Sequence, residues 1–464
     1  MTQRFRVEPA LARRARTVDL AESGTVSATE WVLLGRLAEV GPPKLVRLDL
    51  SREHVLAIVG KRGSGKSFTL GSFLEGLATS EGSTPIGANA RTRGALLFDT
   101  LNIFQWMTTP VAASGSRSEH VTRQASELSA WGLTPVALDV GLWTPAGSEG
   151  RTTASANGFR IRTGDMEAAD WASLLQVDTV MDPMGQLLVL LVDKVTTRGW
   201  VSDQGGPVPG KADYSIADLL RCLAEDGEVA RDYNRETIRA VRQRLAAYEA
   251  SPLFGPVGTR LSELIVPGRL SVMLLSGVPD DLRMVVVFLL IRKLLAARAE
   301  ASEATKHLEL GVGSDASMDH ARLVLEEAPP KCWVVIDEAQ NVLPSERRTS
   351  ASDSLLRFVR EGRNFGLSFG FTTQQPTAID PRIMAQVDTV IAHALTVEKD
   401  LGYVIGNLKS RLPERTSLQG RPLRPADAIR HLAVGQAFVT STSCERGFFM
   451  DVRPRSSVHG GFES

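Results

Sequence analysis

The sequence has little of the chemistry that secreted, metal-binding or membrane-spanning proteins need. Among its 464 residues are three cysteines, Cys222, Cys332 and Cys444, an odd number spread widely along the chain. This spacing argues against a disulfide or zinc framework and indicates a reducing compartment. The longest apolar run, Met284–Ile291, is far shorter than the roughly 20 residues of a membrane span. We therefore expect a soluble, cytoplasmic protein without membrane contact.

Neither sign of charge predominates. Lysine and arginine number 53, aspartate and glutamate number 53, and the formal net charge is zero. A basic coat for nucleic acid is thereby excluded, and any contact with DNA must be local. Hydrophobic residues make up 43% of the chain, so a core can form without disulfides or metals.

Short apolar segments alternate with helical ones, which predicts an α/β fold with a mostly parallel sheet covered on both faces. The expected strands are Trp31–Leu37, Leu45–Leu50, His54–Val59, Ala95–Phe98, Val136–Val140, Leu270–Leu275, Cys332–Ile336, Leu367–Thr373 and Thr389–Ala394. The expected helices are Ser67–Leu77, Glu236–Tyr248, Asp280–Ala299 and Ser352–Arg360. Residues 300–330 are polar, and we expect a mobile insertion or linker there.

A glycine-rich segment lies between an expected strand and an expected helix and fits the pattern G-x4-G-K-[ST]. It reads Gly60-Lys61-Arg62-Gly63-Ser64-Gly65-Lys66-Ser67 and is followed by Phe68. Such a loop wraps backbone N–H groups around the phosphates of ATP, with Lys66 on the β- and γ-phosphates and Ser67 on Mg²⁺. The alternative is an ordinary glycine and serine turn, which does not need this flanking strand and helix.

Two further strand ends carry candidate catalytic groups. Asp337 and Glu338 follow an apolar strand, and we expect Asp337 to hold Mg²⁺ through water and Glu338 to orient the attacking water. Gln374 ends the next strand, where its amide can contact the γ-phosphate and that water. A polar strand end without function is the alternative for each. A glutamate directly after the aspartate is typical of P-loop ATPases with an extra central strand.

Together these motifs resemble the HerA family of the HerA/FtsK group of hexameric DNA translocases. The resemblance covers roughly residues 45–461 and is carried by Gly268–Gly277, Asp280–Arg298, Glu361–Gly366, Thr372–Pro376, Ile379–Arg382, Asp388–His393, Leu395-Thr396 and Val452–Gly461. It implies a RecA-like P-loop ATPase core that uses ATP and Mg²⁺ and assembles as a homohexamer.

On this basis we expect five parts. They are a short N-terminal arm with a reduced β segment (1–50), the core with the phosphate loop (51–164), an inserted helical subdomain (165–265), the second part of the core (266–395) and a C-terminal segment (396–464). Only 59 residues precede Gly60, so the family's N-terminal β-barrel is expected to be shortened or absent.

The chain departs from the family pattern at two positions near the nucleotide. The family's Asp-Pro-His-Gly-Glu-Tyr reads Asp99-Thr100-Leu101-Asn102-Ile103-Phe104, with Ile103 in place of the acidic residue. The family's Gln-Arg-Pro reads Gln374-Gln375-Pro376, without the arginine. Both departures weaken the expectation of efficient translocation more than that of ATP binding.

The arginine-finger candidate is Arg363, in the loop before the Gln374 strand, from which ring ATPases can reach a neighbour's γ-phosphate. A surface ion pair with Glu361 is the alternative role, and Arg382 is the second candidate finger. Weaker candidates for DNA contact, for which solvated charge is the favoured interpretation, are Arg117, Arg123, Arg347 and Arg348. We expect His393 to be packed and hydrogen-bonded, and assign His459 no role.

The predicted function is an ATP-hydrolysing hexameric motor that translocates DNA. The resemblance implies a partner, such as a nuclease or a sirtuin-type effector, in DNA processing or antiviral defence. One alternative is a ring-shaped ATP-binding scaffold that regulates a toxic effector with little DNA movement. Another is a coupling ATPase of secretion or conjugation, which the lack of a membrane anchor disfavours. Stimulation of ATP turnover by DNA would separate motor from scaffold.

Overall fold

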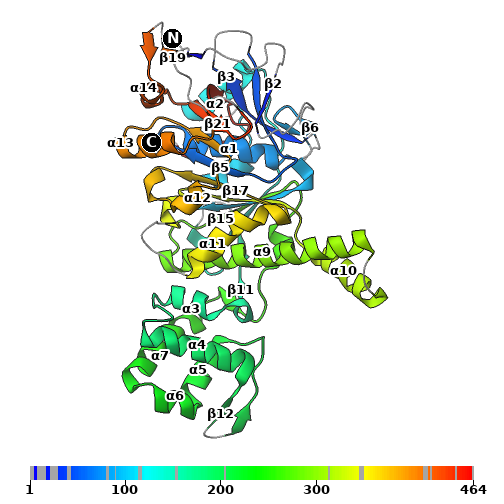
Figure 1. Ribbon diagram of the computed structural model, residues 1–464, viewed down its shortest axis with the longest axis vertical. Coiled ribbons are helices and arrows are strands. Elements are labelled where there is room, and N and C mark those ends of the chain that lie inside the picture. The colour runs from blue at the N-terminus through cyan, green and yellow to red at the C-terminus, as the bar shows by residue number, and fades with distance from the viewer. Residues whose placement is uncertain are drawn as a thin grey trace.

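The chain forms a body built on one large sheet, a helical part at one end of it and a helical hairpin that projects sideways (Figure 1). The computed structural model describes residues 5–7, 17–20, 30–38, 43–79, 83–88, 90–112, 118–151, 155–202, 205–311, 314–343, 350–410, 416–418, 421–444 and 447–461. Within these ranges, no helix has the length and apolarity that crossing a bilayer requires.

Eight neighbouring strands of the sheet are parallel, as expected. In spatial order they are β10 (Asn157–Phe159), β9 (Val140–Pro145), β15 (Leu270–Leu274), β8 (Gly94–Asp99), β16 (Cys332–Ile336), β17 (Leu367–Thr373), β5 (Val55–Val59) and β18 (Thr389–Ala392). Strand β17 lies between β5 and β16, so the extra central strand is confirmed. The carboxyl ends of β5, β16 and β17 therefore meet at one edge.

Beyond β18 the sheet continues with strands from both ends of the chain. They are β21 (Gln436–Ser441), β22 (Phe448–Val452), β3 (Trp31–Leu37), β4 (Leu45–Asp49) and β2 (Thr17–Leu20), and β3 also pairs with β7 (Gly87–Ala88), which pairs in turn with β6 (Ser83–Thr84). The N-terminal strands β2, β3 and β4 thus extend the central sheet. Smaller sheets pair β1 (Phe5–Val7) with β19 (Thr416–Leu418) and β20 (Arg421–Leu423), β11 (Ile161–Arg162) with β14 (Phe254–Gly255), and β12 (Trp200–Ser202) with β13 (Gly206–Val208).

Helices cover both faces of the parallel strands, because successive residues of each strand are buried on opposite sides. Leu56 and Ile58 pack in one cluster with the apolar side of α1 (Lys66–Leu77). Val55, Ala57 and Val59 pack in another with α9 (Asp280–Leu310) and α11 (Ser350–Glu361). The remaining helices of the body are α2 (Glu119–Ala130), α12 (Pro381–Met384), α13 (Glu398–Gly406) and α14 (Pro425–Arg430).

The helical part lies between β11 and β15 in sequence. It contains α3 (Ala168–Leu174), α4 (Pro183–Asp193), α5 (Ile216–Glu225), α6 (Gly227–Asp232), α7 (Arg235–Glu249) and α8 (Leu261–Leu264). Its core is anchored by Trp171, whose Nε1 donates a hydrogen bond to the Tyr214 hydroxyl at 2.7 Å. The expected amphipathic helix is α7, in which Val241 and Leu245 are buried.

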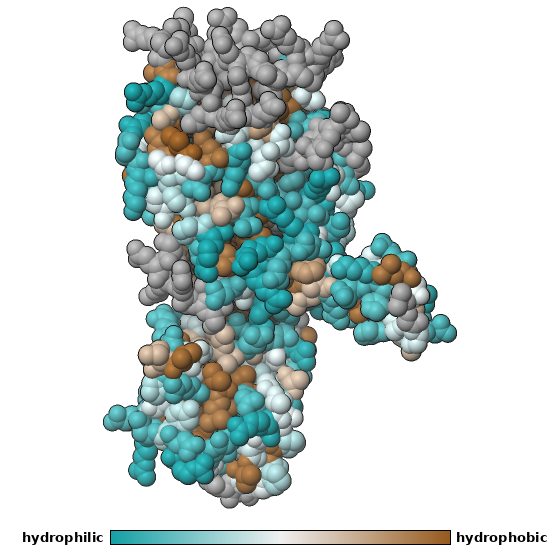
Figure 2. Space-filling view, viewed as in Figure 1, coloured by the Kyte–Doolittle hydropathy of each residue, from teal (hydrophilic) through white to brown (hydrophobic). Residues whose placement is uncertain are grey.

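Two expectations are wrong. The strand expected at Val136–Val140 is β9, which begins at Val140, because Leu138 instead bridges to Thr79 at the end of α1. The mobile linker expected at residues 300–330 is helical: α9 continues to Leu310, and α10 (Asp315–Glu327) packs against it. Small alanines fill their contact, so the hairpin needs few large apolar residues, and Figure 2 shows its mostly hydrophilic surface.

Candidate functional site

The glycine-rich loop between β5 and α1 has a backbone that only glycine accommodates well. Gly63 and Gly65 have φ angles of 72° and 104°, in the left-handed region. A Cβ at Gly60 would lie 2.6 Å from Ser64 Oγ and 2.7 Å from His393 Cβ. The loop is therefore held close to the sheet, and its turn leads directly into the first turn of α1.

Polar groups that suit a polyphosphate converge at the start of α1. The backbone N–H groups of Lys66, Ser67 and Phe68 donate to no group in the described part of the chain, as expected for a first helical turn. Lys66 Nζ is buried and donates to Lys61 O at 3.1 Å. Burial lowers the pKa of Lys66, although Glu338 and Asp337 oppose the shift. A helix N-terminus with a buried ammonium fits an anion well.

Strand β16 delivers Asp337 to the same place. The carboxylate is fully buried, and its Oδ1 accepts a hydrogen bond from Thr372 Oγ1 at 2.7 Å and a longer one from Ser67 Oγ at 3.5 Å. Its Oδ2 has no partner among the residues with defined positions. Burial, reinforced by the nearby Asp99, raises the Asp337 pKa to about 7. A buried carboxylate with one open oxygen beside a hydroxyl fits a hydrated Mg²⁺.

Glu338 is held by two amides. Its Oε1 accepts a hydrogen bond from Gln374 Nε2 and its Oε2 one from Gln340 Nε2, both at 2.7 Å. Lys66 Nζ lies 3.8 Å from Oε1. The Glu338 backbone has φ 53°, an unusual angle outside glycine, and its N–H donates to Thr372 Oγ1 at 2.8 Å. Strained backbone of this kind is concentrated at functional sites.

The structure thus brings together Lys66, Ser67, Asp337, Glu338 and Gln374, but it places Arg363 elsewhere. Arg363 lies before the first residue of β17, whereas the phosphate loop follows the last residue of the parallel neighbour β5. The seven residues of β17, at ~3.3 Å each, therefore separate Arg363 from the edge of the sheet that carries the loop by ~23 Å. Arg363 is paired with Asp388 at 2.7 Å and donates to Gln386 O at 2.7 Å.

The ion pair weighed for Arg363 with Glu361 is wrong. Glu361 pairs with Arg357 at 2.8 Å on the exposed side of α11. The second candidate finger, Arg382, is exposed and pairs with Asp380 at 2.7 Å. Both candidate arginines therefore lie in local ion pairs.

Sequence reasoning missed several residues that complete the site. Thr372 links Asp337 to the backbone of Glu338, Gln340 holds one oxygen of Glu338, and Asp99 is buried beside Asp337. The sequence does contain a pattern that could have identified Asp99, because Asp99 stands at the end of an apolar strand, as Asp337 does. No such pattern marks Gln340, since its position depends on the turn after β16.

His393 lies packed beneath the phosphate loop, as expected. Its Nε2 is 2.8 Å from Thr69 Oγ1 and its Nδ1 is 2.8 Å from Gln436 O. Burial lowers its pKa to about 4, so the ring is neutral at neutral pH. His393 therefore joins α1 to β18 and β21 as a structural contact.

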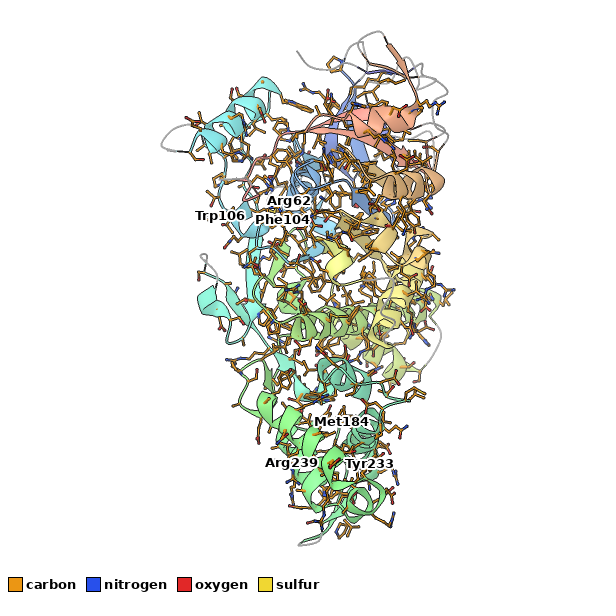
Figure 3. All side chains as sticks on the ribbon, turned by 90° about the vertical axis from the view of Figure 1, so that its left-hand side faces the viewer. Arg62, Phe104, Trp106, Met184, Tyr233 and Arg239 are labelled. Atoms are coloured by element: carbon orange, nitrogen blue, oxygen red, sulfur yellow. The ribbon has the colours of Figure 1, made fainter. Side chains whose placement is uncertain are left out.

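The C-terminal segment runs along α1. Arg453 and Arg455 contact Glu75 at 2.8 and 3.3 Å, and the His459 ring meets the Phe68 ring edge-on with centroids 5.4 Å apart. Figure 3 shows Arg62 of the loop in the same region of the body as Phe104 and Trp106. The segment thus supports both ends of the helix that begins at the loop.

Of the four arginines considered for DNA contact, only Arg123 is among the described residues. Arg117, Arg347 and Arg348 lie outside the described residues. Arg123 is on the exposed side of α2, where its guanidinium is 3.3 Å from His120 Nδ1. Its position gives no support to a DNA contact.

Comparisons with known proteins agree with this geometry. The family model "Helicase HerA, central domain" matches residues 33–294, more than half of the chain. The chain is 26% identical over 178 residues to the DNA double-strand break repair helicase HerA of Pyrococcus furiosus, covering 37% of this chain and 32% of that protein. It is 25% identical over 129 residues to a probable DNA double-strand break repair helicase HerA of Methanocaldococcus jannaschii, covering 28% and 24%.

The chain therefore spans about a third or less of the length of the curated relatives it matches. Among solved structures, VirB4 of Thermoanaerobacter pseudethanolicus has a similar fold, with a TM-score of 0.53 and 14% identity over 93% of this chain and 98% of that one. The family match and the phosphate-loop site together show that the chain belongs to the family of the HerA helicase central domain and has a P-loop ATPase fold.

Proposed function

We propose that the protein hydrolyses ATP with Mg²⁺ and uses the energy to move duplex DNA. The observation that carries this proposal is the meeting of Lys66, Ser67, Asp337, Glu338 and Gln374 at one edge of the sheet. The loop amides and Lys66 bind the phosphates. Ser67 and Asp337 hold Mg²⁺, which supplies charge neutralisation at the phosphates.

Glu338 orients the attacking water and polarises it as a general base. Gln374 and Gln340 fix its two carboxylate oxygens, so the base is positioned before substrate binds. Lys66 and Glu338 are both nearly inaccessible to solvent, which strengthens their electrostatic effect on the reacting groups. The side-chain amide of Gln374 can move from Glu338 to the γ-phosphate. Because Gln374 directly follows β17, loss of the γ-phosphate can change the position of that strand end.

The motor assembles as a homohexamer, in which Arg363 of one subunit serves the site of the next. Support comes from the family and from the distance of Arg363 from its own phosphate loop. The family resemblance also favours an effector partner, such as a nuclease or a sirtuin-type protein, in cytoplasmic DNA processing or antiviral defence. The scaffold alternative is favoured by Ile103, which replaces the family's acidic residue near the nucleotide.

The test is ATP turnover with and without linear duplex DNA, with Lys66→Ala as the control for contaminating ATPases. We expect turnover that requires Mg²⁺ and rises when duplex DNA is added. Turnover that is present but indifferent to DNA would favour the scaffold. No Mg²⁺-dependent turnover above the Lys66→Ala background would overturn the enzymatic assignment.

A further inference from the structure

Helix α7 in the helical part carries a row of arginines that have no partner in the described part of the chain. Arg235, Arg239 and Arg242 are spaced i, i+4 and i+7, which places them on one side of the helix. All three are exposed, and none has a hydrogen bond or ion pair with a residue whose position is described. Figure 3 labels Arg239 in the helical part, at the end of the molecule distant from the N-terminal strands.

Other arginines of the same region have local hydrogen-bond or ion-pair partners. Arg244, on the opposite side of α7, donates to Leu175 O at 2.6 Å. Those paired with carboxylates are Arg162, Arg198, Arg221, Arg231 and Arg260. The row on α7 is therefore a local excess of positive charge in a chain whose net charge is zero.

The spacing of the row suits a phosphate backbone. Seven residues of helix separate the first and third arginines, or ~10.5 Å at 1.5 Å per residue. Duplex DNA carries one phosphate per ~3.4 Å of axis on each strand, so three long guanidinium side chains can reach separate phosphates. Arginine binds phosphate oxygens in a bidentate manner, which lysine cannot do.

The surroundings of the row disfavour a protein partner. The side chains nearest to the arginines on this side of α7 are Ala246, Glu249 and Ile238, and Ile238 is half-buried against the core of the helical part, so no large apolar side chain of α7 is exposed there. Protein interfaces are centred on desolvated aromatic or aliphatic anchors, whereas DNA interfaces are polar and positive. The carboxylates of α7 are only Glu236 and Glu249; Glu249 ends the same side of the helix two turns beyond Arg242, so three arginines face one carboxylate there.

We propose that this face, the side of α7 carrying Arg235, Arg239 and Arg242, binds the sugar–phosphate backbone of duplex DNA. The inference rests on the proposed function, because a motor that moves along any sequence needs contacts that read the backbone. It adds a DNA contact in the helical part, apart from the nucleotide site. The competing occupant is the α9–α10 hairpin of a second copy, which is rich in carboxylates.

The test uses the full chain with Arg235, Arg239 and Arg242 all changed to glutamine, a residue of similar helix propensity. A matched control changes Arg198, Arg221 and Arg260 to glutamine, which removes the same charge from the same part. Binding to a labelled blunt duplex is followed by anisotropy between ~50 and ~200 mM salt. Circular dichroism confirms that both variants are folded.

In the α7 variant, we expect the negative slope of log affinity against log salt to become shallower by about 3. We also expect duplex binding to weaken at least ~10-fold, to the same extent for every DNA sequence. The control should keep the wild-type slope. Equal slopes for wild type and the α7 variant would overturn the assignment while leaving the motor intact. Failure of the wild type to bind duplex DNA would overturn the motor and this inference together. An α7 variant that binds DNA normally but loses self-association in mass photometry would assign the face to a second copy and overturn the DNA contact.

Discussion

Thr372 Oγ1 holds Oδ1 of Asp337 at 2.7 Å, while Oδ2 of the same carboxylate is left without a partner in the described structure. The half-satisfied carboxylate is buried, next to Asp99, and its pKa is raised to about 7. A buried, partly unpaired carboxylate of this kind lowers the stability of the metal-free protein. It becomes favourable once a cation neutralises the charge, which ties Asp337 to metal binding rather than to stability.

The first prediction is that Asp337→Asn stabilises the metal-free protein. A carboxyl whose folded pKa is raised binds more protons when folded, so its contribution to stability falls as pH rises from about 4 to about 7. The variant should therefore gain about 1–3 kcal/mol over wild type near pH 8 and lose that advantage near pH 4. Urea unfolding in EDTA measures this. A gain that does not change with pH would contradict the assigned cause.

The second prediction concerns the pH dependence of metal binding. Because Mg²⁺ must displace the proton of Asp337, affinity for Mg²⁺ with a non-hydrolysable ATP analogue should rise about tenfold per pH unit below about 7 and level off above it. Calorimetric titration across this range gives the profile. The same profile in Asp337→Asn would place the titrating group elsewhere.

The fold and the site were predictable from the sequence to different depths. Strands such as Cys332–Ile336 and the loop from Gly60 to Ser67 are local patterns, so spacing and apolar runs were sufficient to place them. The end of α9 and the whole of α10 were missed because, over residues 300–327, the buried side chains are alanines, and such a polar stretch resembles a linker in composition. The Arg363–Asp388 pair joins the turn before β17 to the residue before β18, and no local pattern encodes it.

The third prediction is that Glu75→Gln strongly destabilises the fold. Burial alone would raise the pKa of Glu75, but Arg453 and Arg455 outweigh it and hold the pKa below its usual range. All three side chains are fully buried. The substitution leaves two guanidiniums without their counter-charge and should cost about 3–5 kcal/mol.

Chemical denaturation measures this cost, and Glu361→Gln, at an exposed pair, is the matched control with little expected effect. The stabilisation by Glu75 is present above the ordinary pKa of a glutamate and is lost as pH falls through its lowered folded pKa. If Glu75→Gln lowered the free energy of unfolding no more than Glu361→Gln does, the ion pairs of Glu75 with Arg453 and Arg455 would contribute little to stability.

The fourth prediction separates binding from hydrolysis. Glu338→Gln should bind the ATP analogue as wild type does, because the loop and Asp337 are unchanged, but its turnover should fall by about 10²–10⁴-fold as the general base is lost. Gln340→Ala should lower turnover less, since Gln374 still holds the other carboxylate oxygen. Steady-state turnover together with analogue binding checks both variants. Wild-type turnover in Glu338→Gln would remove its assigned role.

The last prediction is that Arg363 acts on the neighbouring subunit of a ring. With ATP analogue and Mg²⁺, mass photometry should give a particle near six times 50.2 kDa. Arg363→Ala should retain nucleotide binding, but its ATP turnover should fall by about 10³-fold or more, which is the rate enhancement that an arginine finger supplies in other ATPases and GTPases. Asp388→Asn is the matched control, because it breaks the same ion pair and keeps the arginine. A purely structural pair would make both variants equally impaired.

Complementation then distinguishes action in trans from action in cis. Arg363→Ala and Lys66→Ala subunits are each inactive alone, but in co-expressed mixed rings some sites combine an intact phosphate loop with an intact arginine from the Lys66→Ala neighbour. Those sites should recover part of the wild-type turnover, provided that the ring does not require all sites to fire together. Action in cis predicts no recovery at any ratio, because every site would then lack either its own arginine or its own lysine. Absence of recovery in verified mixed rings would move the finger to Arg382, whose side chain is exposed and pairs only with nearby carboxylates in the part of the chain described.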